Sequence, residues 1–370
     1  MYTRQNPFPS RLKERSLVTA PHSSKKTYHI VLDIAGADFP FKVGDSVGVC
    51  PTNDPQEVEE ILKILRLDPR ESVLDARANI FLSIQEFLLY KANLARVNTA
   101  FLKLLIEKGA PLSSLLEPDN KSQLTEFLHQ TTMREILHHA PLSASDLART
   151  AMPLLPRFYS IANSTKVFPN EIHLLVAYVH YHFNGQTRQG VGSHFLCDFA
   201  EIGATPIPIY LQPSHHFTLP THPETPIILV GPGTGIAPYR AFLQERLALQ
   251  SPGQNWIFFG ERNRATDFYY ADFWLALEEQ GRITLDLAFS RDQSEKVYVQ
   301  HKMYEKRKTL WNWLQQGAYF YLCGDAEKMA KDVDAMLHRI VQEEGLLSPE
   351  DARLYIKKMR AEKRYLTDVY

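Results

Sequence analysis

A glycine-rich turn follows an apolar run in the C-terminal half of the chain. The segment ILVGPGTGIAPYRAF predicts a buried strand, then a turn with Gly231, Gly233 and Gly235, and then a helix. Glycine lets the backbone approach a phosphate closely, and a helix N-terminus supplies free N–H groups. The third glycine of the usual dinucleotide fingerprint is replaced by Ala237 and Pro238. A nucleotide site is therefore the favoured interpretation, and a tight turn without a ligand is the alternative.

A second polar group follows the apolar run ITLDLAF. Ser290 and Arg291 come where this predicted strand ends, and ligands bind at the carboxyl ends of strands in an open sheet. Lys296, Tyr298 and Gln300 follow at a spacing of two, which predicts that they share one face of an extended segment. These side chains together suit a phosphate monoester, because Arg pairs with it in a bidentate way and Lys adds a point charge. A solvated, charged loop is an alternative of equal weight.

The segment RFYSIANS predicts a strand with two chemically different faces. Arg157 and Tyr159 share one face, and Phe158 and Ser160 share the other. A cationic fork beside an aromatic ring suits a nucleotide that carries both a pyrophosphate and a flat ring. An ordinary amphipathic strand is the alternative.

Two further segments place small or polar residues before a predicted helix. In GVGSHF, Gly190 and Gly192 precede Ser193, which we expect to cap the helix beside a second anion site. In YLCGDAEKMAKDV, a strand ends at Cys323, whose thiol is either tuned by the helix that follows or a small buried apolar group. The alternative for the first segment is a capped helix without a ligand.

Composition narrows the class of protein. The 370 residues are too many for one ordinary core, and the formal net charge of −1 argues against a dedicated nucleic-acid binder. The N-terminal residues lack the apolar region of a signal peptide, and we expect no membrane span. Three widely spaced cysteines argue against a disulfide framework and fit a reducing cytoplasm. His180 and His182 share a strand face without a third ligand, so we expect no metal site.

The elements that must position these groups change along the chain. Residues 1–50 alternate apolar and polar positions between glycines and prolines, which predicts antiparallel strands. From about residue 54 to 150 apolar residues recur every three or four positions, with Asn53 and Ser83 as expected helix caps. Strand texture then returns at Pro153. An antiparallel β-barrel interrupted by an α-helical insertion accounts for this order.

After His222 short apolar strands alternate with helical stretches. Strands are expected at 227–230, 256–260, 283–289, 319–324 and 365–370, and helices at 237–249, 267–279, 325–343 and 349–361. This alternation predicts an α/β domain with a mostly parallel, Rossmann-like sheet. We therefore expect a first domain over residues 1–222, with the helical insertion at about 54–150, and a second domain over residues 223–370.

Taken together and in this order, the segments resemble the ferredoxin–NADP reductase superfamily. The segments are FKVGDSVGVCPTNDP, RFYSIANS, GVGSHF, GPGTGIAPYRAF, FFGERNRATDFYY, AFSRDQSEKVYVQ, YLCGDAEKMAKDV and KRYLTDVY. Within the superfamily the chain is most similar to the reductase module of the diflavin enzymes, and above all to the flavoprotein components of NADPH–sulfite reductases. The resemblance covers essentially the whole chain. It implies an FAD-binding barrel and an NADP-binding α/β domain. In FFGERN the residues that follow the glycine depart from the family pattern.

The resemblance also implies which residues contact the two cofactors. On the FAD side these are Arg157, Phe158, Tyr159, Ser160, Leu175, Val176, Ala177, Tyr181, Gly190, Val191, Gly192, Ser193 and Tyr370. On the NADPH side these are Thr234, Ser290, Arg291, Lys296, Val297, Tyr298, Val299, Gln300 and Asp332.

For catalysis the resemblance implies a polar set made of Ser160, Cys323 and Asp368, and a gate formed by Tyr370. Tyr370 would stack on the flavin ring and leave it before the nicotinamide can lie there. The family's FMN domain would precede the first residue of this sequence, so we expect electrons to leave FAD for a separate acceptor. A sulfite reductase haemoprotein, a flavodoxin and a ferredoxin all suit this role. The alternatives are a stand-alone ferredoxin or flavin reductase and a flavin-binding interaction subunit without catalytic activity.

Overall fold

The structure is a computed structural model that describes residues 2–183 and 186–370. The chain divides into two compact units. Unit 1 consists of Met1–Gly48, Phe158–Tyr178 and Glu201–Tyr370, and unit 2 consists of Val49–Arg157 and Val179–Ala200. Each unit is described by itself below.

The first sheet of unit 1 is antiparallel. Its strand order is β6–β3–β10–β1–β2–β7, and β1 pairs antiparallel with β2 and β10, as β2 does with β7. The strands are β1 (Phe8–Leu17), β2 (Thr27–Asp33), β3 (Ser46–Val49), β6 (Arg157–Ser160), β7 (Glu171–Ala177) and β10 (Pro206–Gln212). The antiparallel framework expected from the alternating sequence pattern is confirmed.

The second sheet of unit 1 is parallel throughout, in the order β13–β12–β11–β14–β15. The strands are β11 (Ile227–Val230), β12 (Asn255–Glu261), β13 (Thr284–Phe289), β14 (Tyr319–Gly324) and β15 (Tyr365–Val369). Every residue of the central strand β11 is buried, as a strand covered on both faces requires. The α/β architecture predicted after His222 is confirmed, with each strand within a residue or two of its expected position.

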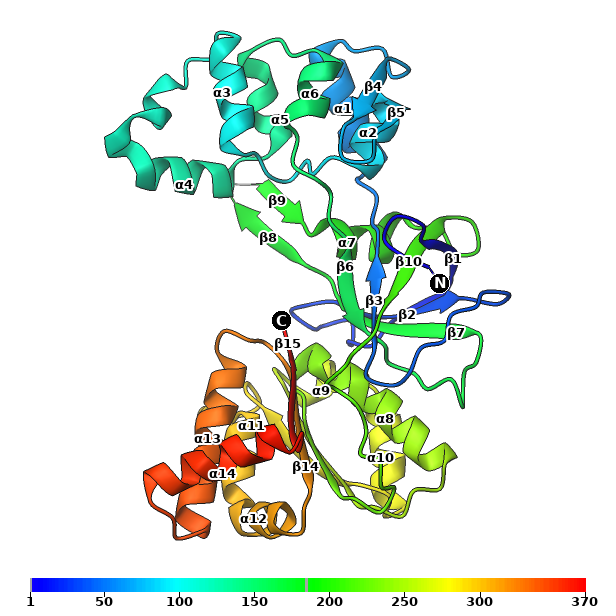
Figure 1. The fold of residues 1–370 in the computed structure, drawn as a ribbon, viewed down its shortest axis with the longest axis vertical. Helices are drawn as coiled ribbons and strands as arrows, with labels where there is room; N and C mark the ends of the chain where they lie inside the picture. Colours follow the sequence, from blue (N-terminus) through cyan, green and yellow to red (C-terminus); the bar gives the residue numbers. More distant parts are fainter. Residues whose placement is uncertain (1, 184–185) are drawn as a thin grey trace. The chain divides into compact units, whose positions relative to one another are not determined.

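Helices cover both faces of the parallel sheet (Figure 1). They are η5 (Gly233–Ile236), α8 (Ala237–Ala248), α9 (Arg264–Asp267), α10 (Ala271–Glu279), α11 (Val299–Glu305), α12 (Arg307–Gln315), α13 (Met329–Glu344) and α14 (Pro349–Ala361). Ile227 and Leu229 point into the core that α8 and α10 cover, whereas Ile228 and Val230 point into the core below α11–α14. This alternation of side chains along β11 gives the sheet two separate hydrophobic cores.

Some helix predictions in unit 1 were wrong. The helix expected over 267–279 begins only at Ala271, as α10, because Tyr270 before it takes the left-handed conformation with φ of 55°, and the short helix α9 ends at Asp267. Helix α13 begins at Met329 rather than at 325, because Asp325 accepts hydrogen bonds from the N–H groups of Lys328 and Met329. The helices α11 and α12 lie where no helix was expected.

Unit 2 is mostly helical. It contains α1 (Pro55–Leu65), β4 (Ser72–Asp75), β5 (Ile80–Ser83), α2 (Ile84–Tyr90), α3 (Thr99–Glu107), η1 (Ser113–Leu116), η2 (Pro118–Asn120), α4 (Lys121–Gln130), α5 (Met133–Ile136), η3 (Leu137–His139), α6 (Ala144–Thr150), β8 (His180–Phe183), β9 (Gln186–Gln189), α7 (Val191–His194) and the π-helical turn η4 (Phe195–Phe199). One hydrophobic core joins α1, α2, α3, α5 and α6. The predicted helical insertion is thus present.

The two expected caps in unit 2 had different outcomes. Ser83 caps α2 in a complete capping box with Glu86, as predicted. Asn53 does not cap α1, since the side chain of Asp54 accepts the hydrogen bond from the N–H of Gln56. Asn53 is buried instead, and its amide donates to the carbonyls of Leu88 and Ala92.

A buried polar cluster joins the antiparallel sheet to the α/β part of unit 1. His29 on β2 hydrogen-bonds through Nδ1 to the hydroxyl of Tyr270 at 2.8 Å, and its ring packs edge-on against His173 on β7. Arg240 on α8 donates to the carbonyl of Ala162 and lies over the ring of Tyr270. Burial lowers the pKa of both histidines, that of His29 to about 3, so both rings are neutral at pH 7.

Candidate functional site

Three predicted polar residues from distant parts of the sequence meet in unit 1. The carboxyl ends of β14 and β15 lie side by side, with Cys323 directly opposite Asp368 in the parallel register. The hydroxyl of Ser160, at the end of β6, lies 2.9 Å from Oδ2 of Asp368. The Sγ of Cys323 lies 3.9 Å from the same oxygen. One carboxylate oxygen therefore joins the hydroxyl and the thiol.

Burial sets the protonation of this group. It raises the pKa of the Asp368 carboxyl above its usual range, and the Ser160 and Cys323 hydrogen bonds oppose that shift. The thiol of Cys323 is fully buried, and burial first, with the Asp368 charge second, raises its pKa well above the ordinary value. Cys323 is thus a protonated thiol inside a strand. Of the two interpretations made from the sequence, the small buried side chain is the one that fits.

Tyr370 lies next to this group at the end of β15. Its backbone N–H donates to the carbonyl of Gly324 at 3.1 Å, and its carbonyl accepts from the N–H of Ala326. Its hydroxyl lies 2.8 Å from the hydroxyl of Thr234. The backbone is therefore held while 63% of the residue is exposed, so the ring is accessible from solvent.

The glycine-rich turn lies against the same strand ends. A Cβ at Gly235 would lie 2.1 Å from the carbonyl oxygen of Cys323, and a Cβ at Gly231 would lie 2.5 Å from the carbonyl oxygen of Gly235. Gly233 has φ of 61°, in the left-handed region. The first turn is a 3₁₀ helix, and α8 then starts at Ala237 with Pro238 in its first turn. Proline is well tolerated there, which accounts for its presence in place of the third glycine.

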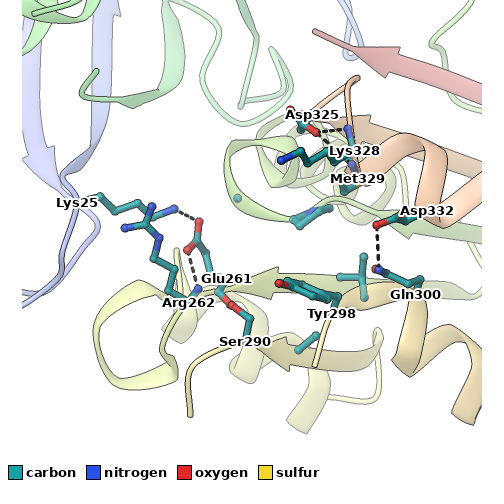
Figure 2. Close-up of a pocket in the computed structure, with 15 residues that line it drawn as sticks. Lys25, Glu261, Arg262, Ser290, Tyr298, Gln300, Asp325, Lys328, Met329 and Asp332 are labelled. Atoms are coloured by element: carbon teal, nitrogen blue, oxygen red, sulfur yellow. Dashed lines mark hydrogen bonds and ion pairs between the residues drawn. The ribbon is translucent and has the colours of Figure 1, made fainter. Parts of the chain in front are cut away.

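A pocket of about 430 Å³ opens beside this turn (Figure 2). It is lined by Lys25, Pro232, Gly233, Gly260, Glu261, Arg262, Ala288, Ser290, Tyr298, Val299, Gln300, Asp325, Lys328, Met329 and Asp332. Apart from Lys25, which lies just before β2, the lining residues come from the ends of parallel strands and from the turns and helix starts that follow, which is where an open α/β sheet binds ligands.

The predicted 290–300 cluster reaches this pocket only in part. Ser290 lines it, and its N–H and hydroxyl both donate to the carbonyl of Glu261. Gln300 lines it and donates to Asp332 at 3.5 Å. Arg291 and Lys296 are exposed and, like Val297, are not among the lining residues in the described chain.

The expectation that Lys296, Tyr298 and Gln300 share the face of an extended segment is wrong. Tyr298 is the N-cap of α11, where its N–H donates to Nδ1 of His301, and Gln300 is inside the helix. Period-two spacing therefore ends at residue 298. Tyr298 and Gln300 still line the pocket, because the start of α11 lies at its edge (Figure 2).

Five charged residues of the pocket were missed from the sequence, namely Lys25, Glu261, Arg262, Asp325 and Lys328. Lys25 forms an ion pair with Glu261, whose other oxygen accepts from the N–H of Arg262 at 2.7 Å. Arg262 donates to the hydroxyl of Ser24. The sequence marks Lys25 only by the dibasic pair Lys25–Lys26, which matches no motif. Glu261 lies in FFGERN, the segment that departs from the family pattern.

The residues predicted to line the flavin lie partly in unit 1. On β7, the side chains of Leu175 and Val176 are buried in the core, whereas Ala177 is exposed. A ligand at this strand would therefore contact the backbone of Leu175 and Val176 and the side chain of Ala177. On β6, Phe158 is 54% exposed and its ring lies edge-on to Tyr210, while Tyr159 is half-buried.

The other predicted flavin residues belong to unit 2. Tyr181 on β8 lines a cavity of about 260 Å³ together with Gln189 and Val191. Arg157 donates to the carbonyl of Leu155 at 2.9 Å and is exposed. Gly190 permits a close approach, because a Cβ there would lie 2.9 Å from the Cβ of Val179.

The expectation that Ser193 caps the helix is wrong. The N-cap position of α7 belongs to Gly190, and Ser193 lies inside the helix, as Gly192 does. Its hydroxyl accepts from the N–H of Val179 at 3.1 Å and donates to the carbonyl of Gly190 at 3.0 Å. Ser193 thus ties the strand end to the turn.

Two features of other classes of protein are absent from the described residues. Within residues 2–183 and 186–370, three or more His, Cys, Asp or Glu side chains nowhere gather in a way that could hold a metal ion. In the same ranges no helix has the length and apolar character needed to cross a bilayer.

Comparison with known proteins assigns both halves of the chain to described families. A model described as FAD binding domain matches residues 2–80 and 106–195, and a model described as oxidoreductase NAD-binding domain matches residues 229–335. The glycine turn with no room for a Cβ, the pocket beside it and the close approach at Gly190 fit such ligands.

Curated relatives match over the whole chain. The proteins named as the NADPH sulfite reductase flavoprotein alpha-component of Mannheimia succiniciproducens, Shewanella oneidensis and Bacillus subtilis are 40%, 40% and 38% identical to it over 375, 376 and 379 residues. The chain spans 62%, 61% and 62% of these relatives. The chain therefore combines a part that matches an FAD binding domain with a part that matches an oxidoreductase NAD-binding domain.

Proposed function

We propose that this protein is an NADPH-dependent FAD reductase that delivers electrons to a separate redox protein. The observation that carries the proposal is the meeting of Ser160, Cys323 and Asp368 beside the ring of Tyr370 and the glycine-rich turn. We assign the flavin to a domain over residues 1–222 and the nicotinamide nucleotide to a domain over residues 223–370.

For FAD, we assign the pyrophosphate to Arg157 and to the backbone N–H groups of 190–193, because these offer a cationic fork and a turn with no room for a Cβ. Tyr159 and Ser160 would lie along the isoalloxazine ring, with the backbone of Leu175 and Val176 and the side chain of Ala177 nearby. Tyr181, which is half exposed and lines a cavity in unit 2, would also line the flavin.

For NADPH, we assign the pyrophosphate to the turn around Thr234 and the adenosine 2′-phosphate to Ser290 and Tyr298, which line the pocket. Arg291 and Lys296 stand in the exposed loop between these two, so they would have to turn inward to reach the same phosphate. Gln300 and Asp332 already face each other at the pocket wall and would contact the adenosine.

When bound, the nicotinamide and flavin carry the redox chemistry, with the nucleotide as electron donor and the flavin as relay. The protein's share is to orient and to stabilise charge. Asp368 orients the hydroxyl of Ser160 and the thiol of Cys323 from one oxygen, so both groups have fixed directions before a ligand arrives. Tyr370 covers the place where the nicotinamide would lie and must move aside.

The acceptor is proposed to be another protein. The curated relatives are named as alpha components of a sulfite reductase, so a sulfite reductase haemoprotein is our first choice. A flavodoxin and a ferredoxin are the other acceptors of suitable chemistry.

The proposal is tested by the colour of the protein and by anaerobic reduction. Purified protein should be yellow or become yellow on addition of FAD, and NADPH should bleach it in the absence of oxygen. Electrons should then pass to a haemoprotein partner in a stopped-flow assay. A colourless protein that takes up no FAD contradicts the proposal, whereas bound FAD that NADPH does not reduce indicates a non-catalytic subunit.

NADPH should be strongly preferred over NADH. Charge-assisted hydrogen bonds contribute about 1.5–3 kcal/mol each, so two contacts to the 2′-phosphate correspond to a preference of about 10²–10⁴ in kcat/KM. Steady-state kinetics with both nucleotides measures this ratio. Equal values would contradict the assignment of the 2′-phosphate to the pocket beside Ser290.

A further inference from the structure

The pocket contains its own buried anion. Glu261, at the end of β12, has a side chain that is 5% exposed, although it faces a pocket assigned to a highly negative ligand. Its Oε1 accepts from the Lys25 ammonium and, at 3.2 Å, from the hydroxyl of Tyr269. Its Oε2 accepts from the N–H of Arg262 at 2.7 Å. A buried carboxylate with this many donors is held firmly in place.

The partner of this anion comes from a different part of unit 1. Lys25 lies just before β2 and extends toward Glu261, as Figure 2 shows. Its side chain is 24% exposed, and the ammonium lies 5.5 Å from the ring centre of Tyr269. Burial first, and then the charges of Arg262 and Arg291, lower the pKa of Lys25 to about 8, so the ammonium needs an anion beside it.

The ion pair lies at the glycine-rich turn. A Cβ at Gly233 would come within 3.4 Å of Oε1 of Glu261. Gly233 is where the backbone leaves room for a phosphate, so the carboxylate lies beside the place that we assign to the dinucleotide pyrophosphate. An ammonium bound to Glu261 is therefore within a side-chain movement of that phosphate.

The charges around the pocket balance. Among the described lining residues, Lys25, Arg262 and Lys328 are cations, and Glu261, Asp325 and Asp332 are anions. Asp325 caps the start of α13, and Asp332 faces Gln300. Among the described lining residues, Glu261 is the carboxylate that forms an ion pair with a cationic side chain of the pocket wall.

We propose that Glu261 is a resident anion that competes with the nucleotide pyrophosphate for the ammonium of Lys25 and thereby weakens nucleotide binding. Glu261 is a positioning residue, because it acts through Lys25. When the pocket is empty, the pair keeps the ammonium inside it; when a nucleotide enters, the ammonium is shared between carboxylate and phosphate. The consequence is faster release of the spent nucleotide. The inference rests on the proposed function for the identity of the ligand.

The test is the affinity for NADP⁺ of the FAD-loaded, full-length protein, measured by titration calorimetry. Glu261→Gln keeps the shape and removes the charge, so the Kd for NADP⁺ should fall by about tenfold, the factor that one weak charge-assisted hydrogen bond represents. The Kd for 2′-AMP, which lacks the pyrophosphate, should change less than about twofold. Asp292→Asn is the matched control, because it removes a carboxylate beside Arg291 that does not line the pocket.

A second variant shows whether Lys25 carries the effect. Lys25→Met should weaken NADP⁺ binding by about tenfold, and Glu261→Gln added to it should then change the Kd less than about twofold. The inference would be overturned if Glu261→Gln increased the affinity for NADP⁺ also in the absence of Lys25. It would also be overturned if the affinity for 2′-AMP rose equally, or if Asp292→Asn increased the affinity for NADP⁺ equally. An unchanged Kd in Glu261→Gln, with flavin content and Tm as in the wild type, would also overturn it. A wild-type protein that binds no NADP⁺ contradicts the proposed function instead.

Discussion

At the residue scale, the functional proposal depends on one shared oxygen atom. Oδ2 of Asp368 contacts both the hydroxyl of Ser160 and the thiol of Cys323, and these three residues are separated by up to 208 positions in the sequence. Composition and spacing alone do not indicate such a group. Its members were predicted from the resemblance to a family, and the structure brings them together.

Asp368→Asn tests the orienting role of this carboxylate. We expect the rate of flavin reduction by NADPH to fall by about 10- to 100-fold with flavin still bound, because the amide can no longer accept two hydrogen bonds at one oxygen of full charge. Burial raises the pKa of Asp368, so the wild-type rate should begin to fall, as the pH is lowered, at a higher pH than the titration of an exposed aspartate would give. This loss of rate at low pH should disappear in the variant. Anaerobic stopped-flow absorbance measures both.

The matched control for this variant is Asp272→Asn on the exposed face of α10. It should leave the rate and its pH profile unchanged. If both variants lower the rate equally, the orienting role of Asp368 is wrong.

The ring of Tyr370 is the second prediction at this scale. Deletion of Tyr370 should narrow the preference for NADPH over NADH, because a nicotinamide would no longer have to displace a ring. Tyr370→Phe removes only the hydroxyl that contacts Thr234, so it should keep most of the preference. The ratio of the two kcat/KM values reports the change, and a deletion variant with the wild-type ratio would contradict the gate.

At the element scale, the parallel sheet was predictable because its three inner strands, β12, β11 and β14, contain runs of buried apolar residues. Strands such as β11 are buried on both faces, so the run IILV stands out against polar helices and loops. The helix α11 was not predictable by the same means. The segment KVYVQ alternates like a strand, yet the contact of Tyr298 with His301 starts a helix there. For α12, the spacing of the buried Leu310, Trp311 and Leu314 was a signal that could have been used.

The turn before α8 gives a prediction about an element. Gly235→Ala should destabilise the protein by several kcal/mol and weaken nucleotide binding, because its Cβ would lie 2.1 Å from the carbonyl oxygen of Cys323 and neither backbone can move freely. Gly203→Ala is the control, since Gly203 has φ of 76° but no heavy atom within 4 Å of a new Cβ. Gly203→Ala should lower the free energy of unfolding by about 1 kcal/mol, because only backbone strain is added. Urea unfolding measures both, and equal losses would show that the close approach is relieved elsewhere.

At the scale of the whole molecule, the antiparallel sheet and the α/β part are joined by polar as well as apolar contacts. His29 and His173 come from β2 and β7, whereas Tyr270 and Arg240 come from the α/β part. Glu171 accepts from His173 and from Lys13 at the edge of this cluster. The sequence pattern showed two sheets, but it did not show that buried neutral histidines connect them.

This cluster predicts how stability depends on pH. The pKa of His29 is about 3 in the folded protein and about 6.5 in an unfolded chain, so the unfolded state binds more protons as the pH falls below 6.5. Stability should therefore be full above pH 6.5 and decrease by about 1.4 kcal/mol per pH unit below it, down to about pH 3. When the free energy of unfolding is measured with urea between pH 7.5 and 5, it should fall less steeply with decreasing pH in His29→Gln than in the wild type. His22→Gln, at an exposed histidine, should keep the wild-type slope.

Lys25 reaches the pocket that we assign to the nucleotide from a segment that precedes β2, more than two hundred residues before the rest of the pocket wall. Chimeric reductases made by joining the flavin half of one parent to the nicotinamide half of another would therefore inherit position 25 and position 261 from different ancestors. Such hybrids would bring together a cation and an anion that had not been selected as a pair, and their cofactor affinity would not be the average of the parents.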